Sequence, residues 1–88
     1  IKSSRLLNYV EFPKYKVDEQ VDILKDRVEL ALRPNSIQNE LLRVIAVSSE
    51  GDARVAIATL RNAALYAEAQ GKPRITKDEI LKAIKKES

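Results

Sequence analysis

Apolar side chains recur every three or four residues along most of this chain, a spacing that predicts amphipathic helices. The first predicted helix has Asp18 as its cap and runs to about Arg33, where Pro34 ends it. The side chains expected to face the core from this helix are Val21, Leu24, Val28, Ala31 and Leu32.

A second predicted helix follows a cap at Asn35 or Ser36. It closes at Gly51, because glycine readily takes the left-handed conformation that ends helices. Its expected apolar face consists of Ile37, Leu41, Leu42, Val44, Ile45, Ala46 and Ser48.

Asp52 is the expected cap of a third helix, which runs from about Ala53 to Gln70 and is ended by Gly71. Small residues dominate its predicted stripe, which allows a close approach of neighbouring helices. The stripe consists of Ala53, Ala56, Ile57, Leu60, Ala63, Ala64 and Ala67.

The start of a fourth helix has a strong local signal. Thr76 and Glu79 are spaced as a capping box, in which each side chain satisfies a backbone N–H of the first turn. Ile75 and Ile80 stand where a hydrophobic staple would lie. The sequence therefore predicts an all-α fold, a small bundle of three to four helices.

Residues 8–12 have some strand character and are followed by Pro13. A single short strand is not stable without partners, and the sequence offers no second strand. We expect this segment to belong to a sheet in a preceding part of a longer protein.

Composition narrows the possible functions. The chain has 88 residues, of which 44% are hydrophobic and 33% charged, as in a small folded domain. It contains no Cys and no His, which excludes disulfides and Cys- or His-dependent chemistry. The formal charge is +3, yet the basic residues are scattered, and Lys82, Lys85 and Lys86 suit the end of a helix. No apolar run is long enough to span a bilayer.

Arg54 stands out because it falls in the first turn of a helix, where the macrodipole disfavours a cation by roughly 0.3–1 kcal/mol. Helix starts also bind phosphate groups. Arg54 is therefore a candidate anion contact, although a solvated arginine that bends away from the dipole would look the same in sequence.

Four segments of the chain together form a recognisable sequence pattern. Residues 10–15 read VEFPKY, residues 22–27 read DILKDR, residues 51–57 read GDARVAI, and residues 75–80 read ITKDEI. Their order and spacing resemble the lid region of archaeal replication initiators, the origin-recognition and cell-division-control ATPases of the AAA+ class. The resemblance covers nearly the whole chain.

The resemblance implies roles for four residues. Arg54 matches the second sensor, the arginine that reaches from the lid to the nucleotide phosphates. Tyr15 and Pro13 match the hinge beside the nucleotide base, and Ile23 faces the same side. The family often has a second proline where this chain has Lys14.

The resemblance also implies a domain organisation. Residues 1–12 would be the end of the nucleotide-binding core, including its last strand, and residues 13–88 would be the hinge and helical lid. The parent protein would be an ATPase that uses ATP or ADP with Mg²⁺. This chain lacks a phosphate loop and paired metal-binding acids, so we expect no hydrolysis and no strong nucleotide binding by it alone.

The expected partners follow from the same family. They are the AAA+ core and a winged-helix domain of the parent chain and, through that parent, origin DNA and the replicative helicase. We expect the lid itself to be a monomer, cytoplasmic and nucleoid-associated, with no membrane contact.

Two other classes of protein share part of this pattern. One is a histone-fold-like DNA-packaging domain, which needs an uninterrupted central helix of roughly 27 residues, whereas Gly51 and Asp52 interrupt the candidate here. The other is a generic helical protein-interaction module. That module would leave the strand-like start and the position of Arg54 unexplained.

Overall fold

The computed structural model describes residues 14–32 and 35–87, and helices dominate this part of the chain. The helices are α2 (Val17–Ala31), α3 (Asn39–Ser48), α4 (Ala53–Ala69) and α5 (Lys77–Glu87). The expected all-α bundle is confirmed. The proposed strand at residues 8–12, the domain boundary after residue 12 and Pro13 lie outside the described residues.

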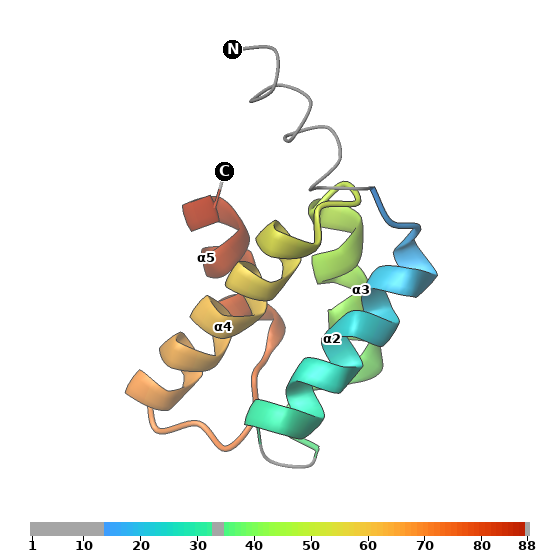
Figure 1. Cartoon of the computed structure of the whole chain (residues 1–88). Helices are drawn as coiled ribbons and strands as arrows, with labels where there is room; N and C mark the ends of the chain where they lie inside the picture. Colours follow the sequence, from blue (N-terminus) through green and yellow to red (C-terminus); the bar gives the residue numbers. More distant parts are fainter. Residues whose placement is uncertain (1–13, 33–34, 88) are drawn as a thin grey trace, which may run out of the picture.

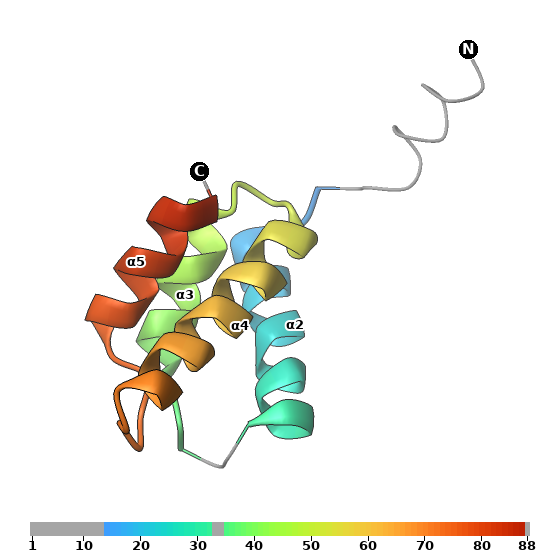
Figure 2. The same ribbon diagram turned by 90° about the vertical axis from the view of Figure 1, so that its left-hand side faces the viewer.

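The helices pack so that α4 contacts each of the others, while α2 and α5 lie on opposite sides of the bundle (Figures 1 and 2). Within the described residues, no Cα atom of α2 lies within 8 Å of one in α5. The Gly51 connection lies at one end of the bundle, and the α4–α5 loop lies at the other.

Each helix contributes fully buried apolar side chains to one core. Those with 0% exposure are Leu24, Ile45, Ala63, Ile80 and Ala83. The predicted stripes are confirmed at most positions, but Ala31 and Ser48 are exposed and their assignment to the core was wrong. Both are the last residue of their helix, where the chain turns away from the packed face.

The starts of two helices differ from the prediction. α2 begins at Val17, before the expected cap Asp18, and its first turn is closed by a bond from the Lys16 N–H to Glu19 Oε1 of 2.9 Å. Asp18 lies in that turn, where the dipole favours a carboxylate.

α3 begins at Asn39, with Gln38 as its cap, so the predicted caps Asn35 and Ser36 were wrong. Asn35 adopts a positive φ of 61°. Ser36 is buried, and its carbonyl oxygen accepts a bond from Ile75 N at 2.7 Å. A tertiary contact between two loops therefore holds the segment that local capping rules assigned to a helix start.

The start of α5 is close to the prediction. Glu79 Oε1 accepts the backbone N–H of Thr76 at 2.7 Å, as in a capping box. The Thr76 hydroxyl, however, donates to the same oxygen at 2.7 Å instead of accepting from the backbone. Ile75 and Ile80 are both buried, as expected for a staple.

The longest described helix, α4, has 17 residues. This is well short of the central helix of a histone fold, because the chain turns at Gly51 between α3 and α4. Within the described residues, no helix is long and apolar enough to cross a membrane.

Candidate functional site around Arg54 and Tyr15

The connection between α3 and α4 is a tight turn. Glu50 and Gly51 both adopt positive φ, at 51° and 86°. Asp52 N donates to Ser49 O at 3.0 Å, which closes the turn. A side chain at residue 51 would also meet a neighbouring segment, since a Cβ there would lie 3.1 Å from Tyr15 O. Glycine is required here both for its conformation and for this close approach.

Asp52 caps α4 and also faces the arginine that follows. Asp52 Oδ1 accepts the backbone N–H of Arg54 at 2.9 Å, which confirms the predicted cap. The other carboxylate oxygen lies 3.6 Å from Arg54 Nη2, and the Arg54 side chain is 64% exposed. An exposed pair at this distance contributes about 0–1 kcal/mol, so another anion can displace it at little cost.

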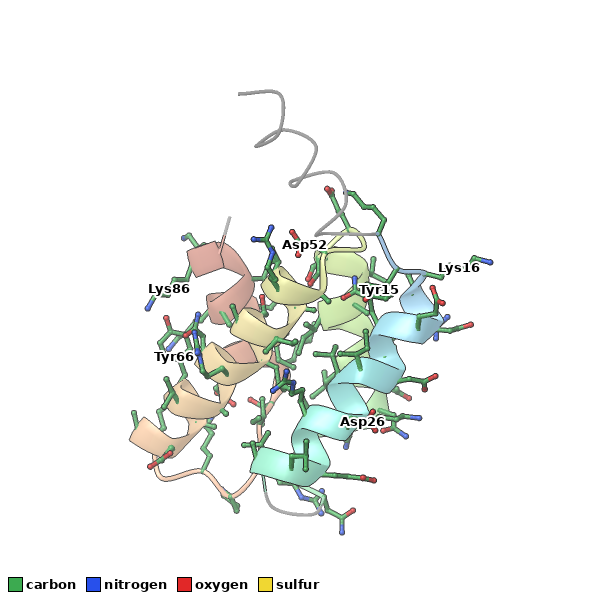
Figure 3. The ribbon with its side chains drawn as sticks, in the orientation of Figure 1. Tyr15, Lys16, Asp26, Asp52, Tyr66 and Lys86 are labelled. Carbon is green, nitrogen blue, oxygen red and sulfur yellow. The ribbon has the colours of Figure 1, made fainter. Side chains whose placement is uncertain are left out.

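Tyr15 lies against this turn although it is distant in sequence. Its backbone N–H donates to Gly51 O at 3.0 Å. Lys14 reinforces the contact, because its ammonium group donates to Glu50 O at 3.2 Å. Figure 3 shows Tyr15 and Asp52 at the same end of the bundle. The structure therefore brings the predicted hinge residue and the start of the Arg54 helix together.

A pocket of about 350 Å³ with both polar and apolar lining residues opens beside this turn. It is bordered by the Lys14 side chain, by the α3–α4 turn and by Val55 and Thr59 of α4. Three hydroxyl groups at the pocket, those of Ser48, Ser49 and Thr59, donate to backbone carbonyl oxygens of their own helices. Their lone pairs can still accept bonds from a ligand.

Ile23 and Pro13 are the remaining predicted site residues. Ile23 lies in α2 and is half-buried, but among the described residues it is not one of the side chains packed against the core. Packing of the core therefore does not explain why an apolar side chain stands at this position. Pro13 lies outside the described residues, so its predicted place beside the base stays a prediction.

Comparison with known proteins identifies the fold that carries this turn. Residues 21–85 match the family described as "Cdc6 AAA+ ATPase-type lid domain". The chain belongs to this family of lid domains. The match includes α3, α4 and their Gly51 connection, together with all but the first turn of α2 and nearly all of α5.

The relatives of this lid are replication proteins. It is 38% identical over 85 residues to the ORC1-type DNA replication protein 2 of Methanosarcina mazei, covering 94% of this chain and 23% of that protein. The ORC1-type DNA replication protein 2 of Saccharolobus solfataricus is 40% identical over 80 residues, covering 84% of this chain and 19% of that protein. The lid thus spans about a fifth of these relatives.

Solved structures agree with this assignment. The ADP form of the Aeropyrum pernix ORC2 protein matches the lid with a TM-score of 0.78 and 34% identity, over 83% of this chain and 20% of that chain. A second structure of that protein, titled "ADPNP-ADP complexes", matches with a TM-score of 0.79 and 33% identity, over 86% and 21%. The expected AAA+ lid fold is therefore confirmed.

Sequence reasoning missed two features of this lid. One is the contact of Lys14 with the Gly51 turn, which no local pattern signals. The other is an ion pair at the opposite end, where Nζ of the partly exposed Lys72 lies 2.7 Å from Oε2 of the buried Glu79. Burial alone would raise the pKa of Glu79, but bonds from Lys72 and Thr76 and the charge of Lys72 outweigh it. The pKa of Glu79 falls from 4.5 to about 2.

Proposed function

We propose that this lid couples the nucleotide state of an ATP-dependent replication initiator to the arrangement of its domains. In this proposal Arg54 contacts the nucleotide phosphates as the second sensor, and Tyr15, Pro13 and Ile23 lie beside the base. The observation that carries it is the 3.0 Å bond from Tyr15 N to Gly51 O. That bond ties the hinge residue to the turn that starts the Arg54 helix.

The electrostatics of α4 support a phosphate contact at Arg54. The residue lies at the positive end of a helix, and its partner Asp52 is 3.6 Å away and partly exposed. A nucleotide phosphate carries more charge than one carboxylate and can attract the guanidinium away from it. Because the Gly51 turn and the hinge segment contact each other, a shift of Arg54 toward a phosphate would be transmitted to the hinge.

Phosphoryl transfer itself belongs to the rest of the parent protein in this proposal. ATP or ADP with Mg²⁺ would bind mainly to the phosphate loop and acidic residues of the AAA+ core, with Arg54 completing the site on lid closure. The isolated lid should bind ATP far more weakly than micromolar, because one exposed arginine contributes little binding free energy. Micromolar ATP binding by residues 1–88 in calorimetry would contradict this division of roles.

The identity of the relatives as replication proteins supports the remaining expected partners. The ORC1-type relatives are DNA replication proteins, so the parent of this lid would act at a replication origin in the archaeal nucleoid. The lid would pack against the AAA+ core and a winged-helix domain of the same chain. Origin DNA and the replicative helicase would be partners of that whole protein, and the isolated lid would be a monomer.

The decisive experiment compares two arginines of α4 in the parent protein. Arg54→Ala should lower ATP turnover at least tenfold, since it removes a positioned phosphate contact. Arg61→Ala is the matched control, because Arg61 is an exposed arginine about two turns further along the same helix. Equal turnover by the folded Arg54→Ala protein and the wild type would refute the sensor role.

A further inference from the structure

The two outer helices of the bundle carry opposite charge. α2 has five carboxylate side chains against two basic ones. α5 has four lysines against three acidic residues, and one of these acids, Glu79, is buried and paired with Lys72. Because α2 and α5 lie on opposite sides (Figures 1 and 2), the bundle has an acidic side and a basic side.

The lysines at the end of α5 share one face of the helix. Lys85 and Lys86 lie three and four residues after Lys82, and all three lysines are exposed. We call these three residues the basic face. Figure 3 shows Lys86 and the α2 residue Asp26 on opposite sides of the bundle. An exposed carboxylate, Asp78, lies one turn before Lys82 and reduces the positive charge there.

We propose that the basic face of α5 binds the phosphate backbone of duplex DNA, independently of the role of Arg54. Its three lysines span about 6 Å of helix axis, and the phosphates of one DNA strand repeat about every 3.4 Å along the duplex axis. Two or three adjacent phosphates are therefore within reach. A duplex on this face has the α2 carboxylates on the far side of the bundle, where salt screens their repulsion.

The helix dipole accounts for only part of the positive charge on this basic face. Lys85 and Lys86 lie in the last turn of α5, where the dipole favours cations. Lys82 lies before that turn, and the dipole does not account for the separation of charge between α2 and α5. The three lysines lie within residues 82–86, which contain no acid, and the helix itself places them on one face.

The test compares two double variants that each remove two positive charges. Lys82→Gln/Lys86→Gln removes cations from the basic face, and Lys25→Gln/Arg27→Gln removes exposed cations from the acidic helix α2. Binding of residues 1–88 to a fluorescent duplex of arbitrary sequence is measured by anisotropy between 25 and 200 mM salt. Circular dichroism confirms that each variant is folded.

The salt dependence is the deciding quantity. Each lost phosphate contact should reduce the slope of log K against log salt by about 0.9 and weaken binding roughly eightfold at 0.1 M salt. The α5 double variant should lose two such contacts and the corresponding part of the slope. The α2 double variant should keep the wild-type slope.

Three outcomes would overturn the proposal. Equal loss of affinity in both double variants would show that net charge alone attracts DNA. Absence of binding by the wild type at 25 mM salt would exclude the contact altogether. Self-association of the wild type that is abolished by the α5 double variant but kept by the α2 double variant would make the acidic helix of a second copy the partner of this face. None of these outcomes bears on ATP turnover, so the sensor role of Arg54 stands or fails separately.

Discussion

Lys72 Nζ lies 2.7 Å from Glu79 Oε2, and the Glu79 residue is completely buried. This pair ties the loop after α4 to the first turn of α5. The same carboxylate accepts bonds from the backbone N–H and the hydroxyl of Thr76. Ile75, the residue before, donates its N–H to Ser36 O, so one cluster joins α5 to both loops at this end.

Breaking this pair from either side should destabilise the lid. Lys72→Met and Glu79→Gln should each lower the free energy of unfolding by about 1–3 kcal/mol, because the first leaves the buried Glu79 carboxylate without its cation and the second removes the charge that pairs with Lys72. The cost stays below that of a fully buried pair because the Lys72 side chain is 34% exposed and water can reach it. Urea unfolding of both variants gives the two values.

The double variant Lys72→Met/Glu79→Gln is the control for this prediction. Residues in direct contact are coupled, so the double variant should lose less stability than the sum of the two single losses. Additive losses would show that the pair contributes no interaction of its own.

The low pKa of Glu79 predicts a specific loss of stability in acid. Its pKa is about 2 in the folded lid and 4.5 as an ordinary value, so the unfolded chain binds a proton more readily. The stabilising contribution is therefore fully present above about pH 4.5 and is lost as the pH falls toward 2. Unfolding measured from pH 7 to pH 2 checks this window.

Glu79→Gln isolates this residue from the other carboxylates that titrate in the same range. The difference in stability between wild type and Glu79→Gln should be constant above about pH 5 and should shrink below pH 4.5. A difference that does not change across this range would mean that Glu79 has no depressed pKa.

Local signals predicted some elements of this fold well. The start of α5 was predictable because its capping residue, its acidic residue and its staple lie within six residues of one another. The cap at Asp52 was predictable because the glycine that ends α3 and the capping aspartate are adjacent in the sequence. The start of α3 was not, because Ser36 is engaged by Ile75 across the bundle, and no short-range pattern encodes that contact.

The candidate site was predicted by a different route. Periodicity placed Arg54 at a helix start, but it gave no reason to bring Tyr15 near Gly51. The family resemblance assigned Tyr15 and Arg54 to one nucleotide site but did not predict the backbone bond between Tyr15 and Gly51 that the structure contains. The burial of Glu79 escaped prediction because a glutamate at the start of a helix is normally solvated, and its partner Lys72 is positioned only by the folded loop.

Glycine should be more strongly required at residue 51 than at residue 71. Both have a positive φ, so alanine at either position should cost about 1–2 kcal/mol in backbone strain. At residue 51 the new Cβ also lies 3.1 Å from Tyr15 O, whereas at residue 71 no atom lies within 4 Å. Thermal or urea unfolding should therefore show a larger loss for Gly51→Ala than for Gly71→Ala.

Equal losses for the two glycine variants would mean that the hinge segment moves away without cost. In that case the contact between Tyr15 and the Gly51 turn would be too soft to transmit a shift of Arg54. In the parent protein, Gly51→Ala should also weaken nucleotide binding, while Gly71→Ala should leave it unchanged.

Arg54 should contribute to function without contributing much to folding. Its side chain is 64% exposed and its 3.6 Å pair with Asp52 is weak, so Arg54→Ala should change the free energy of unfolding by less than about 0.5 kcal/mol. Leu60→Ala is the opposite case, because Leu60 is 4% exposed in the core. Its truncation should cost about 2–5 kcal/mol.

Both variants are to be unfolded thermally as residues 1–88 and assayed for ATP hydrolysis in the parent protein. We expect Arg54→Ala to melt like the wild type and to lose ATP turnover. Leu60→Ala should melt at a lower temperature and, while still folded, bind nucleotide normally, because its side chain faces the core and not the Gly51 turn. If instead Arg54→Ala unfolds the lid, while a folded full-length variant hydrolyses ATP normally, then the arginine serves the structure of α4 and the sensor assignment is wrong.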